Sequence, residues 1–209
     1  MSAGTDPAVV FSGRSNEMQR GAHEAALMVR GAGEGREVRL IVNGAPPETV
    51  RAARRLLSQV AGRAVEVRGF TTDKERQREE TRRADVVLVP CRDEHVGLTA
   101  LDAIAAGVPV LVPDTCGMGR FLLDGGRFDP RLTEHSVIRR EEGEEAAPLE
   151  RWIAELADVL GDPDTARRRA AELRDALLTA LQTLQSAGES AADLVKAIVA
   201  VRGNGSSDD

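Results

Sequence analysis

The chain has 209 residues, enough for one large domain with its own hydrophobic core. Its formal net charge is −6 and only 2% of its residues are aromatic, so both charge and the lack of stacking side chains argue against a nucleic-acid partner. No apolar run approaches the ~20 residues of a transmembrane helix, and the first residues lack the pattern of a signal peptide. We therefore expect a cytoplasmic protein without a transmembrane segment.

Short apolar runs alternate with helical patterns in the first part of the chain. Within the predicted strands at 85–89 and 108–112, residues 86–89 and 108–112 are continuously apolar, as strands buried on both faces of a sheet must be. In a helix at 47–61, we expect Leu56, Leu57 and Val60 on the apolar face. The alternation predicts an α/β fold with a single Rossmann-like, doubly wound parallel sheet of about six strands. Strands are predicted at 8–12, 37–42, 64–68, 85–89, 108–112 and 135–139, and helices at 19–30, 47–61, 73–83 and 97–106.

The sequence changes in character after Arg140, where a charged loop leads into purely helical patterns. Apolar residues at three- and four-residue spacing predict an amphipathic helix between Leu149 and Leu160. Asp162 and Pro163 then end one helix and begin the next, and helices are expected at 164–186 and 190–201. We divide the chain into a Rossmann-like core at 1–145, C-terminal helices at 146–202 that pack on or extend the same domain, and a disordered tail at 203–209.

Two loops are expected to meet at one edge of this sheet. In a doubly wound sheet, ligands bind at the carboxyl ends of the two strands where the strand order reverses, here the first and the fourth. The loop after the first strand contains Gly13, Arg14 and Arg20, and the loop after the fourth ends at a helix amino-terminus formed by residues 97–99. Guanidinium groups that face unpaired amides suit a diphosphate, although each residue taken singly also fits a surface or helix-start position.

The second of these loops carries a recognisable motif. Glu94 and Asp102 are separated by seven residues in EHVGLTALD, and AIAAGVPVLVPD follows. This block resembles the E-x7-E motif of retaining "group 1" glycosyltransferases with the GT-B fold, commonly EGFGLxxLEAMAxGxPVVxSD. VVFSGR followed by Arg20 and Gly21 resembles the family's FxGR…KG, the turn at Phe70 its GxV/GF turn, and ADVVLVPCRDE its ADxxxxPSxxE. The resemblance covers roughly residues 8–175 and is to the C-terminal, donor-binding domain alone.

The resemblance implies a role for each matching position. Glu94 would be the catalytic residue that contacts the donor sugar or its diphosphate, and Asp102 would accept hydrogen bonds from the ribose hydroxyls. The two arginines would neutralise the diphosphate, so the resemblance implies a metal-independent enzyme with a nucleoside-diphosphate sugar as donor and no further cofactor. The implied substrate-binding residues are Gly13, Arg14, Arg20, Phe70, Gly97, Leu98, Thr99 and Asp102.

The sequence also departs from the family's pattern. The second carboxylate is an aspartate, the basic pair is two arginines, and His95 and Val96 stand where glycine and phenylalanine are usual. Cys116 replaces the first glycine of a common pair, and we interpret it, like Cys91, as a buried small residue rather than a metal ligand. The chain starts where the second of the family's two domains starts, so we expect the acceptor-binding half to be absent.

Three functions remain open from the sequence. The chain is either the donor half of a glycosyltransferase, completed by an acceptor-binding partner or by self-association, or a non-catalytic nucleotide-sugar sensor, or a structural protein that retains only the fold. An apolar stripe within residues 177–201 is the expected docking face, unless these helices simply pack on the sheet.

Overall fold

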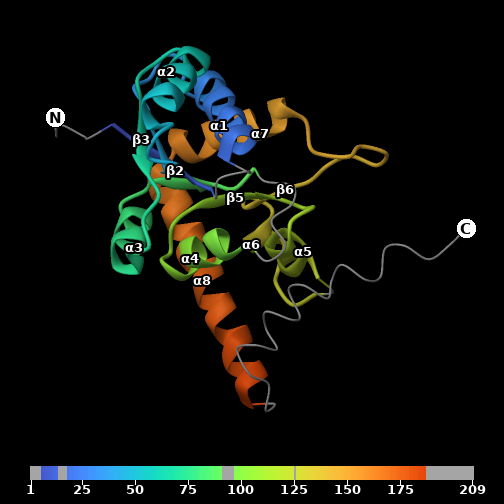
Figure 1. Cartoon of the computed structure of the whole chain (residues 1–209). Helices are drawn as coiled ribbons and strands as arrows, with labels where there is room; N and C mark the ends of the chain where they lie inside the picture. The colour runs from blue at the N-terminus through green and yellow to red at the C-terminus, as the bar shows by residue number, and fades with distance from the viewer. Residues whose placement is uncertain (1–5, 14–17, 91–96, 125, 187–209) are drawn as a thin grey trace, which may run out of the picture.

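Six parallel strands form one sheet in the order β3-β2-β1-β4-β5-β6 (Figure 1). The structure is a computed structural model that describes residues 6–13, 18–90, 97–124 and 126–186. The order reverses between β1 and β4, which confirms the predicted doubly wound sheet. The strands are β1 (Ala8–Ser12), β2 (Arg39–Ala45), β3 (Val65–Gly69), β4 (Val86–Leu88), β5 (Val110–Pro113) and β6 (Val137–Ile138).

Helices cover both faces of this sheet (Figure 1). One face carries α1, α2 and α7, and the opposite face carries α4, α5 and α8. This arrangement lets each strand connect through a helix to the next parallel strand without crossing the sheet edge. Within the described residues the helices are α1 (Met18–Ala32), α2 (Val50–Ala61), α3 (Lys74–Arg82), α4 (Leu98–Ala105), α5 (Gly117–Leu123), α6 (Pro130–Thr133), α7 (Leu149–Gly161) and α8 (Pro163–Ser186).

The two-residue alternation of the strands produces two separate cores. In β1, Val9 and Phe11 pack against α1, α2 and α7, whereas Ala8 and Val10 pack on the side of α4, α5 and α8. All four side chains are at most 7% exposed, so β1 is buried on both faces. A strand without a solvent-facing side is continuously apolar, as the sequence is at this position.

The C-terminal helices belong to these two cores. Trp152 and Leu156 of α7 are buried beneath α1, and an added Cβ at Gly31 of α1 would lie 2.6 Å from Ile153 Cδ1. The chain then turns at Asp162, whose Oδ1 accepts a hydrogen bond from Thr165 N at 3.1 Å, which confirms the predicted cap of α8. Leu177 of α8 is 1% exposed and packs in the core with α4, so it does not contribute to an exposed docking face.

Several sequence expectations need correction. Leu56 is 57% exposed, because the stripe of α2 that faces the sheet runs through Ala53, Leu57 and Ala61 at helical spacing and leaves the neighbouring position in solvent. The helix also begins at Val50 and not at 47. Helices α5 and α6 were not predicted, since each has fewer than eight residues and no full apolar period. The expected helix at 190–201 and the tail at 203–209 lie outside the described residues.

Candidate functional site

The point where the strand order reverses lies between β1 and β4. Their residues pair in register, Val10 beside Val87 and Phe11 beside Leu88, so both strands end at the same edge of the sheet. From this edge α1 follows on one face and α4 on the other. The amino-termini of α1 and α4 thus lie on opposite faces beside this edge, and doubly wound domains bind their ligands in the crevice at such a switch point.

The floor of this crevice is formed by the ends of β1 and β2. Gly13 donates its backbone N–H to Asn43 O at 3.2 Å, and Asn43 Nδ2 donates to Ser12 Oγ at 3.4 Å. Gly44 has a φ of 103°, and a Cβ there would collide with the Gly13 carbonyl oxygen, so glycine is required for the two strand ends to approach. The sequence reasoning missed both Asn43 and Gly44, although their Asn-Gly pair is a turn signal that could have marked them.

Gly97 determines how α4 begins. Its φ and ψ are 74° and 41°, in the left-handed region, and an added Cβ would lie 2.7 Å from Met118 Cβ in α5. The first turn has no side-chain cap at this position, since glycine has no side chain to offer. The amides of Leu98 and Thr99 lack intrahelical partners as first-turn groups, so they form a region of positive potential at the crevice.

Asp102 lies on the exposed side of the same helix. It follows Leu98 by four residues, and residues at this spacing share a helix face. Leu98 is 49% exposed, and Asp102 is also exposed. In the part of the chain that the structure describes, no hydrogen bond or ion pair joins the Asp102 carboxylate to another side chain, so it remains available as a hydrogen-bond acceptor.

Phe70 is presented at the end of the edge strand β3. Its backbone N–H donates to Ala45 O at 2.9 Å and so fixes the main chain, while its side chain is 57% exposed. The turn that follows is closed by hydrogen bonds: Gln77 Nε2 donates to Thr71 O at 2.6 Å, and Asp73 Oδ1 accepts from Glu75 N and Arg76 N at 3.0 Å each. An exposed aromatic ring on a fixed turn suits stacking against a planar ligand.

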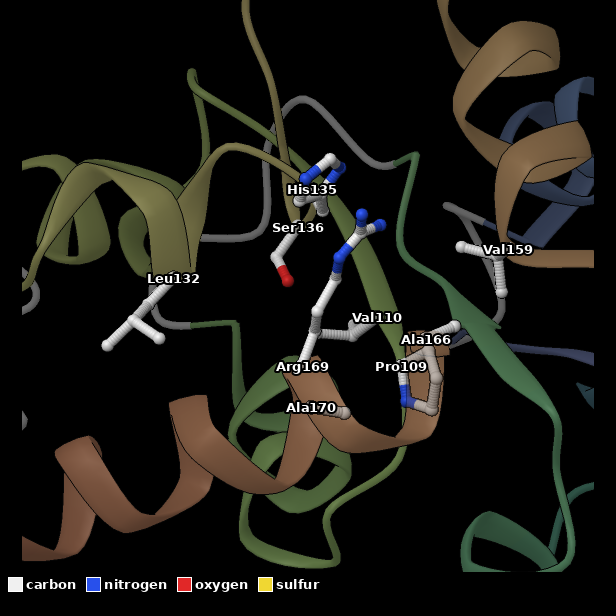
Figure 2. Close-up of a pocket in the computed structure, with 9 residues that line it drawn as sticks. All are labelled: Pro109, Val110, Leu132, His135, Ser136, Val159, Ala166, Arg169 and Ala170. Carbon is white, nitrogen blue, oxygen red and sulfur yellow. The ribbon is translucent and has the colours of Figure 1, made fainter. Parts of the chain in front are cut away.

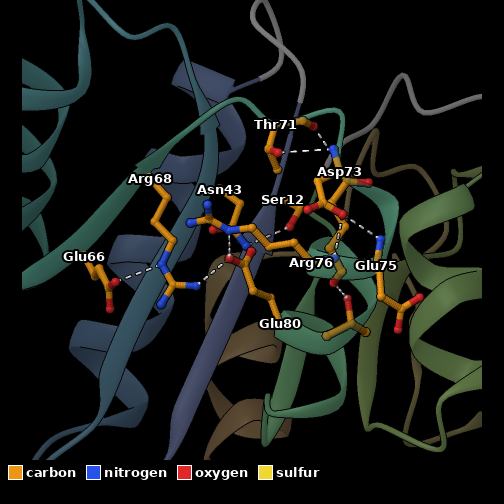
Figure 3. Close-up of polar contacts among 11 residues, drawn as sticks. Ser12, Asn43, Glu66, Arg68, Thr71, Asp73, Glu75, Arg76 and Glu80 are labelled. Carbon is orange, nitrogen blue, oxygen red and sulfur yellow. Dashed lines mark hydrogen bonds and ion pairs between the residues drawn. The ribbon is translucent and has the colours of Figure 1, made fainter.

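A chain of ion pairs supports this turn from below (Figure 3). Arg68 of β3 pairs with Glu66 at 2.8 Å and with Glu80 of α3 at 3.0 Å, and Glu80 also pairs with Arg76 at 3.1 Å. The hydrogen bond from Arg68 lowers the pKa of Glu66, so this carboxylate stays ionised at neutral pH. The network ties α3 to β3. The link was not predicted, because the pair that connects the two elements, Arg68 with Glu80, is a tertiary contact between β3 and α3.

The remaining predicted site residues fall beyond what the structure describes. Arg14 and Glu94 lie outside the described residues, as do Cys91 and His95. Arg20 belongs to the first turn of α1, and the structure describes only its backbone. The roles of Glu94 and of the two arginines therefore stay predictions.

A small cavity lies at the opposite end of the strands, where β5 and β6 begin (Figure 2). It is lined by Pro109 and Ser136, which precede β5 and β6, by His135 and by Arg169 of α8. Its volume of about 20 Å³ is enough for a water molecule but far below that of a nucleotide site. Burial raises the pKa of Glu155, whose carboxylate lies 3.9 Å from His135. This edge is not the ligand site.

The described residues form neither a cluster of metal ligands nor a membrane-spanning helix. Within residues 6–13, 18–90, 97–124 and 126–186, no three His, Cys, Asp or Glu side chains form a cluster that could hold a metal ion. Cys116 instead caps α5, since its Sγ accepts a hydrogen bond from Gly119 N at 3.3 Å. Over the same ranges, none of the helices combines the length and the apolar character needed to cross a membrane.

The fold described above is that of the Rossmann-like C-terminal half of GT-B glycosyltransferases. The C-terminal domain of a glycosyl transferase group 1 family protein (LpcC) from Francisella tularensis superposes with a TM-score of 0.62 at 16% identity, covering 83% of this chain and 85% of that one. The catalytic domain of cholesterol-alpha-glucosyltransferase from Helicobacter pylori gives a TM-score of 0.59 at 18% identity, covering 86% of this chain and 99% of that one. At these identities the likeness establishes the fold.

The family follows from the sequence itself. Residues 2–190 match the family described as "Family 4 Glycosyltransferase in conflict systems", and the chain belongs to this family. The D-inositol 3-phosphate glycosyltransferase of Nocardia farcinica is 30% identical over 173 residues, which are 78% of this chain and 35% of that protein. The chain therefore spans about a third of the length of this curated relative.

Proposed function

We propose that this chain is the donor-binding half of a GT-B glycosyltransferase and binds a nucleoside-diphosphate sugar in the crevice between β1 and β4. In this proposal Asp102 accepts hydrogen bonds from the ribose hydroxyls and Phe70 stacks on the base. Glu94 contacts the donor sugar. The diphosphate is held by cations and amides contributed by Gly13, Arg14, Arg20, Gly97, Leu98 and Thr99.

The start of α4 is the observation that carries this proposal. Gly97 adopts a left-handed conformation close to Met118 and begins α4 near the edge where β1 and β4 end, with no side-chain cap from Gly97 itself. Unpaired amides and the helix dipole favour an anion there. Asp102 then stands one helical turn further along, exposed, as an acceptor for hydroxyl groups next to that anion.

The proposed chemistry is retaining sugar transfer without a metal. When the glycosidic bond of the donor breaks, negative charge develops on the departing diphosphate. In this proposal Arg14, Arg20 and the amides at the start of α4 stabilise this charge, which is the contribution that this half makes to the rate. We further propose that the acceptor site comes from a separate acceptor-binding protein or from a second copy of the chain, and that the protein acts in the cytoplasm.

A non-catalytic sensor of nucleotide sugars is the second candidate. It is compatible with the match to the C-terminal domain of LpcC, because that domain of the same fold was crystallised by itself, as a stand-alone sensor requires. A sensor binds the same donor but neither hydrolyses it nor transfers its sugar when any acceptor-binding partner is supplied. Release of free nucleoside diphosphate from the donor, measured with and without such a partner, separates the two candidates.

The test of the diphosphate site uses the two arginines. Arg14→Ala and Arg20→Ala should each weaken the binding of a nucleoside diphosphate by about 1–3 kcal/mol. The affinity for the corresponding nucleoside should stay nearly unchanged, because only the phosphates need cations. Arg51→Ala, on an exposed position of α2, is the matched control. If nucleoside and diphosphate affinities fall together, the arginines support the fold and the proposed site is wrong.

A further inference from the structure

A row of three polar side chains crosses the sheet near the carboxyl ends of β1, β2 and β3. Ser12, Asn43 and Arg68 are partners in register on these neighbouring strands. Figure 3 shows the three side chains next to one another, and Asn43 Nδ2 donates to Ser12 Oγ at 3.4 Å. The preceding pair on the same face, Val10 and Ile41, is apolar and at most 6% exposed. The face of the sheet thus changes from apolar to polar at this row.

The fold does not require an asparagine in this row. Asn43 follows a Leu-Ile-Val run in β2, and asparagine is disfavoured in strands. Its Oδ1 is buried and has no hydrogen-bond partner in the part of the chain that the structure describes. An unpaired buried acceptor lowers the stability of the fold, and a leucine of similar size would avoid this cost. Violations of this kind are typical of binding sites.

The two uncharged side chains of the row offer hydrogen-bond donors to a ligand. Asn43 is half-buried while its Oδ1 is shielded, so the amide N–H groups are the polar groups that this side chain can present. Ser12 is also half-buried, and its Oγ accepts one of these N–H groups. Among the described residues, the Ser12 hydroxyl has no acceptor for its own proton. A ligand atom that lies against this pair is therefore an acceptor.

The charges beside the row balance. Arg68 pairs with Glu66 and Glu80, and Arg76 pairs with Glu80. Two guanidinium groups and two carboxylates leave no excess positive charge to hold a phosphate. A neutral acceptor, such as a carbonyl group on a ring, is the chemical group that suits this position.

The row also has the direction that a bound nucleoside requires. It begins in β1, on the face covered by α4 with Asp102, and ends in β3, next to the turn that carries Phe70. Neighbouring strands lie ~4.8 Å apart, so the row spans roughly 10 Å, which is about the length of a nucleoside. Asn43 also lies two residues before Ala45, whose carbonyl accepts from Phe70 N at 2.9 Å. A nucleoside with its ribose at Asp102 and its base at Phe70 lies along the row.

We propose that Asn43, together with Ser12, donates hydrogen bonds to the carbonyl of the base that lies farthest from the ribose; this assignment rests on the proposed function. Uracil and guanine carry a carbonyl at this position. Cytosine and adenine carry an amino group there, which offers donors to donors and is rejected. The row thus restricts the donor to a sugar linked to uridine or guanosine diphosphate.

Matched pairs of nucleoside diphosphates test this selectivity by calorimetric titration of the full chain. Uridine and cytidine diphosphate differ in this carbonyl or amino group, as do inosine and adenosine diphosphate. The carbonyl member of each pair should bind at least about tenfold more tightly, a difference of about 1.4 kcal/mol. Equal affinities within a pair that binds overturn the inference and leave the proposed function standing. Failure of wild type to bind any of the four overturns the proposed function, and the inference with it.

Variants of Asn43 separate recognition of the base from support of the fold. Asn43→Leu should bring the two affinities of each pair to within about twofold without lowering stability in urea, because the unpaired buried oxygen is removed. Asn43→Asp should reverse the preference, since a carboxylate accepts from the amino group and repels the carbonyl. Gln59→Leu, on an exposed position of α2, is the matched control and should keep the wild-type preference.

Pyrophosphate is the probe that has no base. Its affinity should stay within about twofold of wild type in every variant, because the row does not contact the diphosphate. A parallel loss of pyrophosphate binding in Asn43→Leu would show that Asn43 supports the fold, and this result overturns the inference. A tenfold preference for the carbonyl base that survives in Asn43→Leu overturns it as well.

Discussion

Replacing Gly97 by alanine tests how tightly the start of α4 is constrained. A non-glycine residue in the left-handed region costs about 1–2 kcal/mol. The new Cβ would also lie 2.7 Å from Met118 Cβ, and such overlaps in packed cores cost about 1–3 kcal/mol. Replacing glycine also reduces the conformational entropy of the unfolded chain, which offsets these costs by about 0.4–1 kcal/mol. We expect Gly97→Ala to lower the free energy of unfolding by about 2–4 kcal/mol, measured by urea denaturation.

Gly62 provides the matched control. It has a φ of 65° as the cap of α2, and nothing lies within 4 Å of the position of its missing Cβ. Gly62→Ala therefore carries the backbone cost without the overlap and should lower the free energy of unfolding by about 1 kcal/mol. Equal losses in the two variants would refute the reasoning, because Met118 would then place no constraint on the start of α4.

Three further predictions address α3, pH and the C-terminal segment. Glu80→Ala removes the ion pairs to Arg68 and Arg76 and should lower the free energy of unfolding by about 0.5–1 kcal/mol. It should also weaken the binding of nucleosides but not of pyrophosphate, with Glu79→Ala on the same helix as the control. Equal effects on the binding of both ligands would contradict a role in base binding. The pKa of Glu66 is lowered in the folded state, so its contribution is present above the ordinary carboxyl pKa and is lost as the pH falls through the folded value. Because its side chain is 44% exposed, the contribution should be small: at pH 7 wild type should be more stable than Glu66→Gln by under about 1 kcal/mol. Urea unfolding measured from pH 7 to pH 3 should show this difference vanish in acid. A difference that stays constant would show that titration of Glu66 is not responsible. Truncation after Ser186 should abolish self-association or partner binding in light scattering, and a monomer in both forms would remove the docking function of this segment.

The sheet could be predicted because burial on both faces leaves a direct record in the sequence. Val87 and Val110 sit in runs without a polar residue, and such runs indicate central parallel strands. Leu56 was assigned to the wrong face because Leu56, Leu57 and Val60 span a wide arc of α2, and only contact with the sheet decides which of them is buried. Short helices such as α5 lack a full period, so no hydrophobic pattern could reveal them.

The candidate site was only partly accessible from the sequence. The motif located Gly97 and Asp102, and the strand order placed them at the crevice. The contacts that fix the site did not follow from any local pattern: the collision that makes Gly44 necessary involves Gly13, and the ion pair of Arg68 with Glu80 joins β3 to α3. These are tertiary contacts between segments that the sequence leaves unrelated.

Calorimetric titration of Asp102→Ala is the most direct test of the central claim, that the β1/β4 crevice binds a nucleoside diphosphate. Asp102 is exposed on α4, so the substitution should leave the stability of the fold nearly unchanged. We predict that wild type binds uridine or guanosine diphosphate and that the variant binds it about 1–3 kcal/mol more weakly, because two ribose hydroxyls lose a charged acceptor. Equal affinities of wild type and variant, or no binding by wild type, would contradict the account.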